Sequence, residues 1–318
     1  IASYKGKLYV GGGSKQFGVF EYEGGTEWRP SKIFSNREVP DGCFPHAMCR
    51  HNGKLFVAYP GTHSFDGKTW TFAGLPSDND WFLQTHSMTI FQGKLQAGTW
   101  PESKVSSYEG GETWKVLGRV GVEGTEVNAL AVYNGKLYGG ALPFAEACRY
   151  DGNFDWTSLH RFYSPPSFKP GPPGKMSRQD IKEASRLTSL AVYNGRLFAS
   201  IGSSTSSILD APADVRGKVF SMEAGRVASY DNDLGPGWKH LVAMRDRGEL
   251  KLFVNGKLVS TSSSFEPSEY DLSTNQPLRI GFGQTEYFAG RMADVRLYKG
   301  ALDDRQIQKL YSVKPNEE

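Results

Sequence analysis

The chain has 318 residues, enough to bury one large hydrophobic core or two smaller ones. It is rich in glycine and aromatic residues and nearly lacks long helical patterns, which favours many short strands joined by tight turns. The net charge of +3 is small and charges of both signs are mixed, so the sequence does not indicate binding to nucleic acid or to a membrane surface. No apolar run is long enough to span a bilayer.

A hairpin pattern begins at the N-terminus and recurs along the chain. Each copy is an apolar run, a turn closed by glycine and a second apolar run, as in ALAVYNGKLYGGAL from Ala129. Three of the turns are Asn-Gly, a strong hairpin signal because both central residues need positive φ. The chain starts inside this repeat, so we expect a mature or trimmed fragment. The turn glycines are Gly6, Gly53, Gly93, Gly135 and Gly195.

The second half of the repeat is a strand ending in an aromatic residue, an acidic turn and a tryptophan. The copies end at Trp28, Trp70, Trp114 and Trp156, with a looser one at Trp238. Successive first halves lie roughly 40 to 47 residues apart in the first four copies, within the range of a four-stranded propeller blade. One unit cannot cover its own apolar faces, so we expect neighbouring units to stack, with the tryptophans between them and the acidic side chains bonded to turn backbone.

The aromatic–Asp–Gly–x–Thr–Trp turns resemble the Asp-box of sialidase-type and related propellers over about the first half of the chain. Glu replaces Asp at Glu23 and Glu109. The Asp-box is a structural turn of enzymes and non-enzymes alike, so the resemblance implies a fold and no activity. We therefore predict an all-β chain that forms a β-propeller of about five recognisable blades.

A different pattern follows from about Val219. It resembles the C-terminal half of a laminin-G-like (concanavalin A-like) jelly-roll module, although only about 100 residues remain and such a module needs more. We predict propeller blades over 1–205 and a laminin-G-like antiparallel β segment over 206–318, either separate from the propeller or merged with it. The matching features are Gly-Trp-x-His at Gly237, Leu-x-Leu-Phe-Val-Asn-Gly at Leu250, Leu-Arg-Ile-Gly at Leu278, Gly-Arg-x-x-Asp-Val-Arg-Leu-Tyr at Gly290 and a short helix led by Asp303.

Polar side chains occupy matching places just before each predicted inner strand. Propellers bind ligands on the loops that lead into these strands, so the side chains could converge on one polar ligand at the mouth of the channel. Alternatively, each satisfies backbone groups at the corner of a blade. The candidate ligand-binding residues are His46, His86, Asn128 and Thr188, with Arg186 and Trp81 beside them.

No catalytic constellation stands out among these residues. His46 and His86 lie one blade apart, but no third ligand is identifiable, so no metal site is predicted. A sialidase-like site would need several clustered arginines, whereas Arg186 alone lies at the predicted rim. A polysaccharide lyase could use a rim histidine as base, with Arg186 nearby.

Two smaller features leave alternatives open. Asp231 and Asp233 could bind calcium, as laminin-G-like modules sometimes do, or form a plain Asx turn. Cys43 and Cys49 could bridge a short loop and leave Cys148 unpaired, or all three cysteines are inert thiols.

Three functions fit the sequence. The first is a non-catalytic, lectin-like protein, extracellular or at the cell surface, that binds glycans or glycoproteins. The second is a hydrolase or lyase that acts on a polysaccharide at the channel mouth. The third is a structural scaffold whose exposed laminin-like edge binds a partner. Nucleic-acid binding and membrane insertion are not expected, and the oligomeric state stays open.

Overall fold

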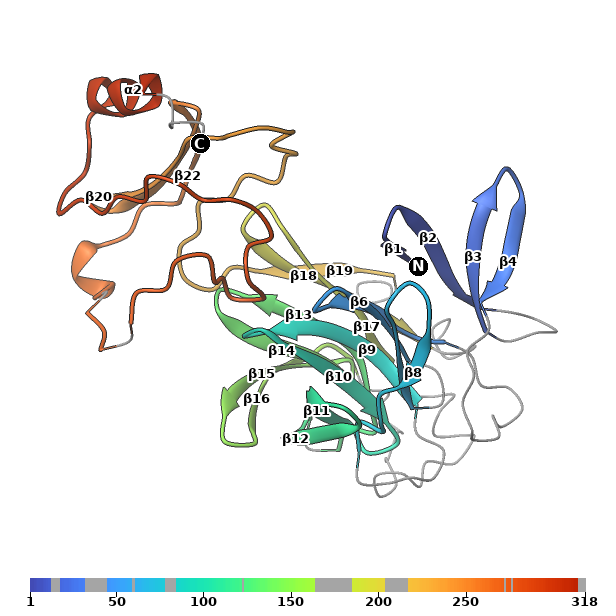
Figure 1. The fold of residues 1–318 in the computed structure, drawn as a ribbon. Helices are drawn as coiled ribbons and strands as arrows, with labels where there is room; N and C mark the ends of the chain where they lie inside the picture. The colour runs from blue at the N-terminus through green and yellow to red at the C-terminus, as the bar shows by residue number, and fades with distance from the viewer. Residues whose placement is uncertain are drawn as a thin grey trace. The chain divides into compact units, whose positions relative to one another are not determined.

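The computed structural model is built almost entirely of antiparallel sheets (Figure 1). It falls into two compact units: Ile1–Ala191, Ala199–Phe220 and Gln284–Glu286 form the first, and Val192–Phe198, Ser221–Gly283 and Tyr287–Glu318 the second. The boundary between residues 205 and 206 that the sequence predicts for the two domains stays a prediction. The structure describes residues 1–12, 18–31, 45–58, 61–77, 84–121, 123–163, 185–203, 217–271, 273–275 and 277–313.

Four of the sheets are four-stranded meanders, in which each strand pairs with the next along the chain. Each corresponds to one copy of the repeat, so the all-β class and the blade-like unit are confirmed. The strands are β1 (Ala2–Tyr4), β2 (Lys7–Gly12), β3 (Gly18–Gly24) and β4 (Glu27–Ser31); β5 (Met48–His51), β6 (Lys54–Ala58), β7 (Thr62–Phe65) and β8 (Trp70–Phe72). They continue with β9 (Gln84–Phe91), β10 (Lys94–Trp100), β11 (Lys104–Gly110) and β12 (Thr113–Arg119); β13 (Glu126–Tyr133), β14 (Lys136–Leu142), β15 (Glu146–Gly152) and β16 (Asp155–Arg161).

The fifth copy forms a three-stranded sheet, which lacks a fourth strand among the described residues. Its strands are β17 (Ser185–Tyr193), β18 (Arg196–Ser203) and β19 (Val219–Met222).

The hairpin turns have the predicted geometry. Asn134 and Gly135 both have positive φ, at 46° and 72°, and the four other copies repeat this pattern. A Cβ added at Gly135 would meet nothing within 4 Å, so the positive φ, and not crowding, is what favours glycine there.

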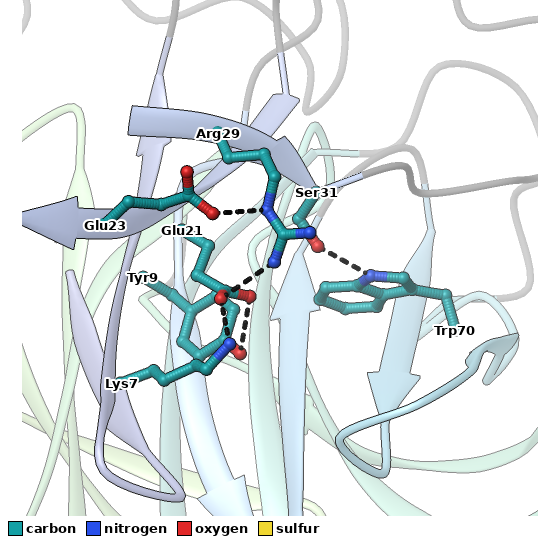
Figure 2. Close-up of polar contacts among 7 residues, drawn as sticks. All are labelled: Lys7, Tyr9, Glu21, Glu23, Arg29, Ser31 and Trp70. Atoms are coloured by element: carbon teal, nitrogen blue, oxygen red, sulfur yellow. Dashed lines mark hydrogen bonds and ion pairs between the residues drawn. The ribbon is translucent and has the colours of Figure 1, made fainter. Parts of the chain in front are cut away.

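Three tryptophans tie each sheet to the one before it. The Trp70 Nε1 donates to the Ser31 Oγ at 2.9 Å, as Figure 2 shows. The Trp114 Nε1 donates to the Ala73 carbonyl at 2.7 Å, and Trp156 repeats the contact with Leu117 at 3.0 Å. In each case the acceptor lies three residues after the tryptophan of the preceding sheet. The recurring tryptophans therefore pack between sheets, as predicted.

Trp28 departs from that prediction. Its side chain is 39% exposed and its ring lies against Tyr22, with ring centres 5.0 Å apart. The reason is positional, because Trp28 belongs to the first sheet and no sheet precedes it among the described residues.

This difference gives a stability prediction with an internal control. Trp114→Phe is expected to lower the free energy of unfolding by about 1 to 2 kcal/mol, because the carbonyl of the buried Ala73 loses its donor. Trp28→Phe removes an equivalent side chain without an inter-sheet bond and is expected to cost less than about 0.5 kcal/mol. Urea unfolding of both variants checks this, and equal losses would contradict the inter-sheet role.

A charged cluster joins three strands of the first sheet (Figure 2). Glu21 on β3 is 6% exposed and accepts bonds from Lys7, from Arg29 at 3.0 Å and from the Tyr9 hydroxyl at 3.2 Å. Burial favours a raised pKa for Glu21, but the bonds from Lys7 and Arg29 lower it below its ordinary value. Arg29 also contacts Glu23 at 2.9 Å, so the cluster ties β2, β3 and β4 together.

The acidic turn residues only partly follow the prediction. Asp66 accepts the backbone N–H groups of Lys68 and Thr69 at 2.7 and 2.8 Å, as expected. At Glu23, Glu109 and Asp151 the carboxylate bonds to side chains instead, as in the contact of Glu109 with Lys94 at 2.6 Å. Two successive positive-φ glycines make the Glu109 turn, so its backbone needs no side-chain acceptor to hold it.

The second unit contains the sheet β20 (Leu241–Asp246), β21 (Glu249–Val254) and β22 (Lys257–Thr261), a 3-10 turn η2 (Pro267–Glu269) and a helix α2 (Asp304–Ser312). The predicted helix start at Asp303 is confirmed, because Asp303 and Gln306 form a reciprocal capping box. The Leu-Arg-Ile-Gly stretch forms no strand, and just after it Phe282 and Tyr287 make an isolated bridge. None of the described helices is both long and apolar enough to cross a membrane.

Candidate functional site

The inner strand β9 begins with a bulge at His86. Thr85 and Ser87 pair with Thr99 and Gly98, which are consecutive, so His86 is an extra residue without a partner. A bulge of this kind turns its side chain out of the regular alternation, and bulges often lie beside binding or active sites.

The same irregularity recurs in the neighbouring sheets. In β13 the extra residue is Asn128, which interrupts the pairing with β14 at the equivalent place. Ahead of β5, the His46 N–H donates to the Ala58 carbonyl at 3.2 Å while the Ala58 N–H donates to Ala47 at 2.9 Å, so two consecutive residues face one partner. The repeat therefore directs His46, His86 and Asn128 by one local device.

These positions correct one detail of the prediction. His86, Asn128 and Thr188 lie inside β9, β13 and β17, not before them, and only His46 precedes its strand. The strands begin earlier than the apolar pattern indicates because the polar residues at their starts pair with the second strand of each hairpin.

Glu126 is the centre at which the candidates meet. Its carboxylate lies 2.8 Å from the His86 Nδ1, accepts the Asn128 Nδ2 at 2.5 Å and lies 3.3 Å from the Arg186 Nη2. The His86 Nε2 lies 2.9 Å from the Gln84 Oε1. Side chains of β9, β13 and β17 thus converge on one carboxylate.

Glu126 is a buried charge with its partners in place. Its side chain is 4% exposed, and burial favours a raised pKa. The bond and positive charge of His86, with the charge of Arg186, outweigh burial and lower the pKa of Glu126 to about 2. The carboxylate is therefore ionised at neutral pH and holds the His86 ring by Nδ1.

The His46 ring lies against the His86 ring. The His46 and His86 rings have centres 4.2 Å apart and planes at 30°. Burial, and then the positive charge of His86, lower the pKa of His46 to about 4, so its imidazole is neutral at pH 7. A neutral imidazole can accept a hydrogen bond or a proton from a bound molecule.

The remaining candidates do not join the cluster. The Thr188 hydroxyl donates to the Ser200 carbonyl at 3.2 Å and lies 2.8 Å from the Ser200 hydroxyl. Trp81 lies outside the described residues. The arrangement thus brings His46, His86, Asn128 and Arg186 together and leaves Thr188 apart.

The candidates chosen from the sequence did not include Glu126 or Gln84. Both lie two residues before a chosen candidate, as Arg186 lies two before Thr188. Alternate residues of a strand share a face, so this second polar row was the signal that could have identified Glu126.

The metal and cysteine predictions stay open. The Asp231 carboxylate accepts the Asn194 N–H, and Asp233 accepts the Gly235 N–H at 2.8 Å, which is an Asx turn. No group of three His, Cys, Asp or Glu gathers in the described part of the chain, and nothing below depends on calcium. Among the described residues Cys49 and Cys148 are free thiols, and Cys43 lies outside them.

One stretch of the chain matches a family model. Residues 191–308 match the concanavalin A-like lectin/glucanases superfamily. The matched stretch is less than half of the chain, and it confirms the resemblance of the C-terminal segment. The Asp-box resemblance stays a prediction. No curated protein matches the chain.

Solved structures give only remote likenesses. YCF48 bound to D1 peptide is 13% identical over 74% of this chain and 71% of that chain, with a TM-score of 0.38. The extracellular domain of BT4673 from B. thetaiotaomicron is 15% identical over 78% and 30%, with a TM-score of 0.34. An S-layer domain-containing protein from Clostridium thermocellum is 16% identical over 65% and 92%, with a TM-score of 0.23. At these scores the likenesses carry no argument.

Proposed function

We propose that the chain is a carbohydrate-binding protein, extracellular or at the cell surface, and that the cluster around Glu126 holds part of a glycan. The observation that carries the proposal is the convergence of His46, His86, Asn128 and Arg186, from four successive repeats, around one buried carboxylate. Similarity of residues 191–308 to a lectin and glucanase superfamily supports the same ligand class.

The chemistry of the cluster suits sugar hydroxyls. Imidazole, amide and guanidinium groups offer planar donors and acceptors at fixed positions, which give orientation and specificity in a polar site. Glu126 fixes its partners before any ligand arrives, so little side-chain freedom is lost on binding. Arg186, 20% exposed, retains donors beyond its bond to Glu126, and the Asn128 Oδ1 has no partner among the described residues.

A glycan array followed by calorimetric titration of the best glycan tests the proposal. His46→Ala is expected to weaken binding at least about tenfold, the equivalent of about 1.4 kcal/mol, because it removes a neutral acceptor of the cluster. Thr188→Ala is the matched control, since Thr188 occupies the equivalent repeat position but bonds to Ser200, and its affinity should equal that of the wild type.

Two results would count against this site. An array without any bound glycan would contradict carbohydrate binding. If His46→Ala binds the glycan as tightly as the wild type, the binding site lies outside the cluster, and the concanavalin A-like stretch is the next place to test.

A second candidate function is that of a polysaccharide lyase or hydrolase. The contact of Glu126 with the His86 Nδ1 favours it, because a carboxylate that orients an imidazole beside a second, neutral imidazole is an arrangement for proton transfer. Turnover of acidic and neutral polysaccharides tests it. Unchanged turnover by a His46→Ala/His86→Ala double variant would exclude these residues as the base.

A further inference from the structure

A short loop of the C-terminal sequence lies against the hairpin turns of the first unit. The loop is Gln284–Glu286, which belongs to that unit although the residues on either side belong to the second. It is the tip of a small hairpin, because Phe282 bridges Tyr287 and the Phe288 N–H donates to the Gly281 carbonyl at 2.8 Å.

The tip bonds to the turns of two successive sheets. The Gln92 N–H donates to the Gln284 carbonyl at 3.1 Å, and the Gly93 N–H donates to the Thr285 carbonyl at 2.7 Å. The Gly135 N–H of the next sheet donates to the Gln284 Oε1 at 2.7 Å. Main-chain and side-chain acceptors of the tip are therefore both used.

A third sheet contributes a side chain. The His51 Nδ1 lies 3.3 Å from the Glu286 carboxylate, and the His51 side chain is 4% exposed. The Asn52 side chain contacts the other ring nitrogen at 3.1 Å. The main chain of the tip thus bonds to the β9–β12 sheet, and the side chains of Gln284 and Glu286 contact the sheets after and before it.

The turns suit this role for a geometric reason. In a two-residue turn with both φ values positive, the N–H groups of the two central residues point away from the hairpin and are left without partners inside it. Gln92, Gly93 and Gly135 are such residues. Asn194 repeats the pattern in the second unit, where its N–H donates to the Asp231 carboxylate.

This surface is separate from the Glu126 cluster. His86 lies near the start of β9, whereas Gln92 and Gly93 follow its last residue, Phe91. Six residues of extended chain span about 20 Å, so the two ends of the inner strands offer two distinct surfaces.

We propose that the turns His51–Gly53, Gln92–Gly93 and Asn134–Gly135 form a binding surface for an acidic hairpin loop of the Gln-x-Glu type, which the chain's own Gln284–Glu286 tip occupies here. The contacts come from backbone donors and one buried histidine, so a loop of the same chemistry supplied in trans takes the same place when the resident tip is weakened. A second copy of this chain, which carries the same loop, is then the partner.

The test uses the full chain with the tip weakened by Gln284→Gly and Glu286→Gly. The probe is a fluorescein-labelled peptide of the sequence Gly281–Phe288, closed by a disulfide between added terminal cysteines, and anisotropy measures its binding. The weakened chain should bind the probe at least about tenfold more tightly than the wild type, because the resident tip competes at a high effective concentration.

Two controls make the result specific. A control cyclic peptide with alanine at the positions of Gln284 and Glu286 should bind the weakened chain at least about tenfold less tightly than the probe. Amide exchange at Gly93 and Gly135 should be slow in the wild type and faster in the weakened chain, which also reports whether the variant stays folded. Three results would overturn the proposal. They are equal binding of the probe by the wild type and the weakened chain, no binding by the weakened chain, and equal binding of the probe and the alanine control peptide.

Discussion

Glu126→Gln is expected to lower the free energy of unfolding at pH 7 by about 3 kcal/mol, a large share of the stability of one unit. The substitution keeps the shape of the side chain but removes the charge that His86 and Arg186 share. The Arg186 guanidinium then stays partly buried without a balancing carboxylate, and the His86 Nδ1 loses its charged partner, so the loss exceeds the value of any single bond in the cluster.

The loss should depend on pH in a defined direction. The folded protein lowers the pKa of Glu126 from its ordinary value of 4.5 to about 2. The ionised carboxylate therefore contributes its full stabilisation above about pH 4.5, and the contribution disappears as the pH falls to about 2. Urea unfolding between pH 2 and pH 7 should show wild type and Glu126→Gln converging at the acid end.

The matched control is a glutamate with one exposed partner. Glu109→Gln removes a carboxylate that is 30% exposed and bonded to Lys94, so it should cost less than about 1 kcal/mol. If Glu126→Gln costs no more than this, or if its cost is the same at pH 2 and pH 7, the carboxylate is not the centre of the cluster.

The turns show what local pattern alone can predict. Asn-Gly between two apolar runs dictates positive φ at two residues whatever surrounds them, and the backbone at Asn134 and Gly135 has that geometry. The helix start at Asp303 depends on residues within one turn and was equally visible. Both features are decided by neighbours in the sequence, so no knowledge of packing was needed.

Glu126 shows where local pattern ends. Its burial and its contacts with His86 and Arg186 arise only when successive sheets meet. The repeat predicts that equivalent positions recur, but not which member of a polar row becomes buried. Trp28 fails for a related reason, because its burial depends on a sheet before it and not on its own copy of the motif.

Gly118→Ala is the second substitution with a large expected effect, a loss of more than about 3 kcal/mol. Gly118 has φ near +105°, which residues with a side chain rarely adopt. A Cβ there would lie 2.3 Å from the Phe154 carbonyl oxygen of the next sheet. Backbone strain costs about 1 to 3 kcal/mol by itself, and the clash with main chain adds to it because two packed sheets must separate.

Gly110→Ala separates strain from the approach of the sheets. Gly110 has φ near +109°, but its Cβ would meet nothing within 4 Å, so this variant carries the strain alone. Gly74 repeats the crowding of Gly118, since its Cβ would lie 2.1 Å from the Glu112 carbonyl oxygen of the next sheet. Both crowded glycines lie four residues after the tryptophan of their own sheet and face the residue two before the next tryptophan. The urea midpoints of unfolding of Gly74→Ala and Gly118→Ala should therefore be similar, and both should lie well below the midpoint of Gly110→Ala. Three similar midpoints would mean that the sheets do not meet at these glycines.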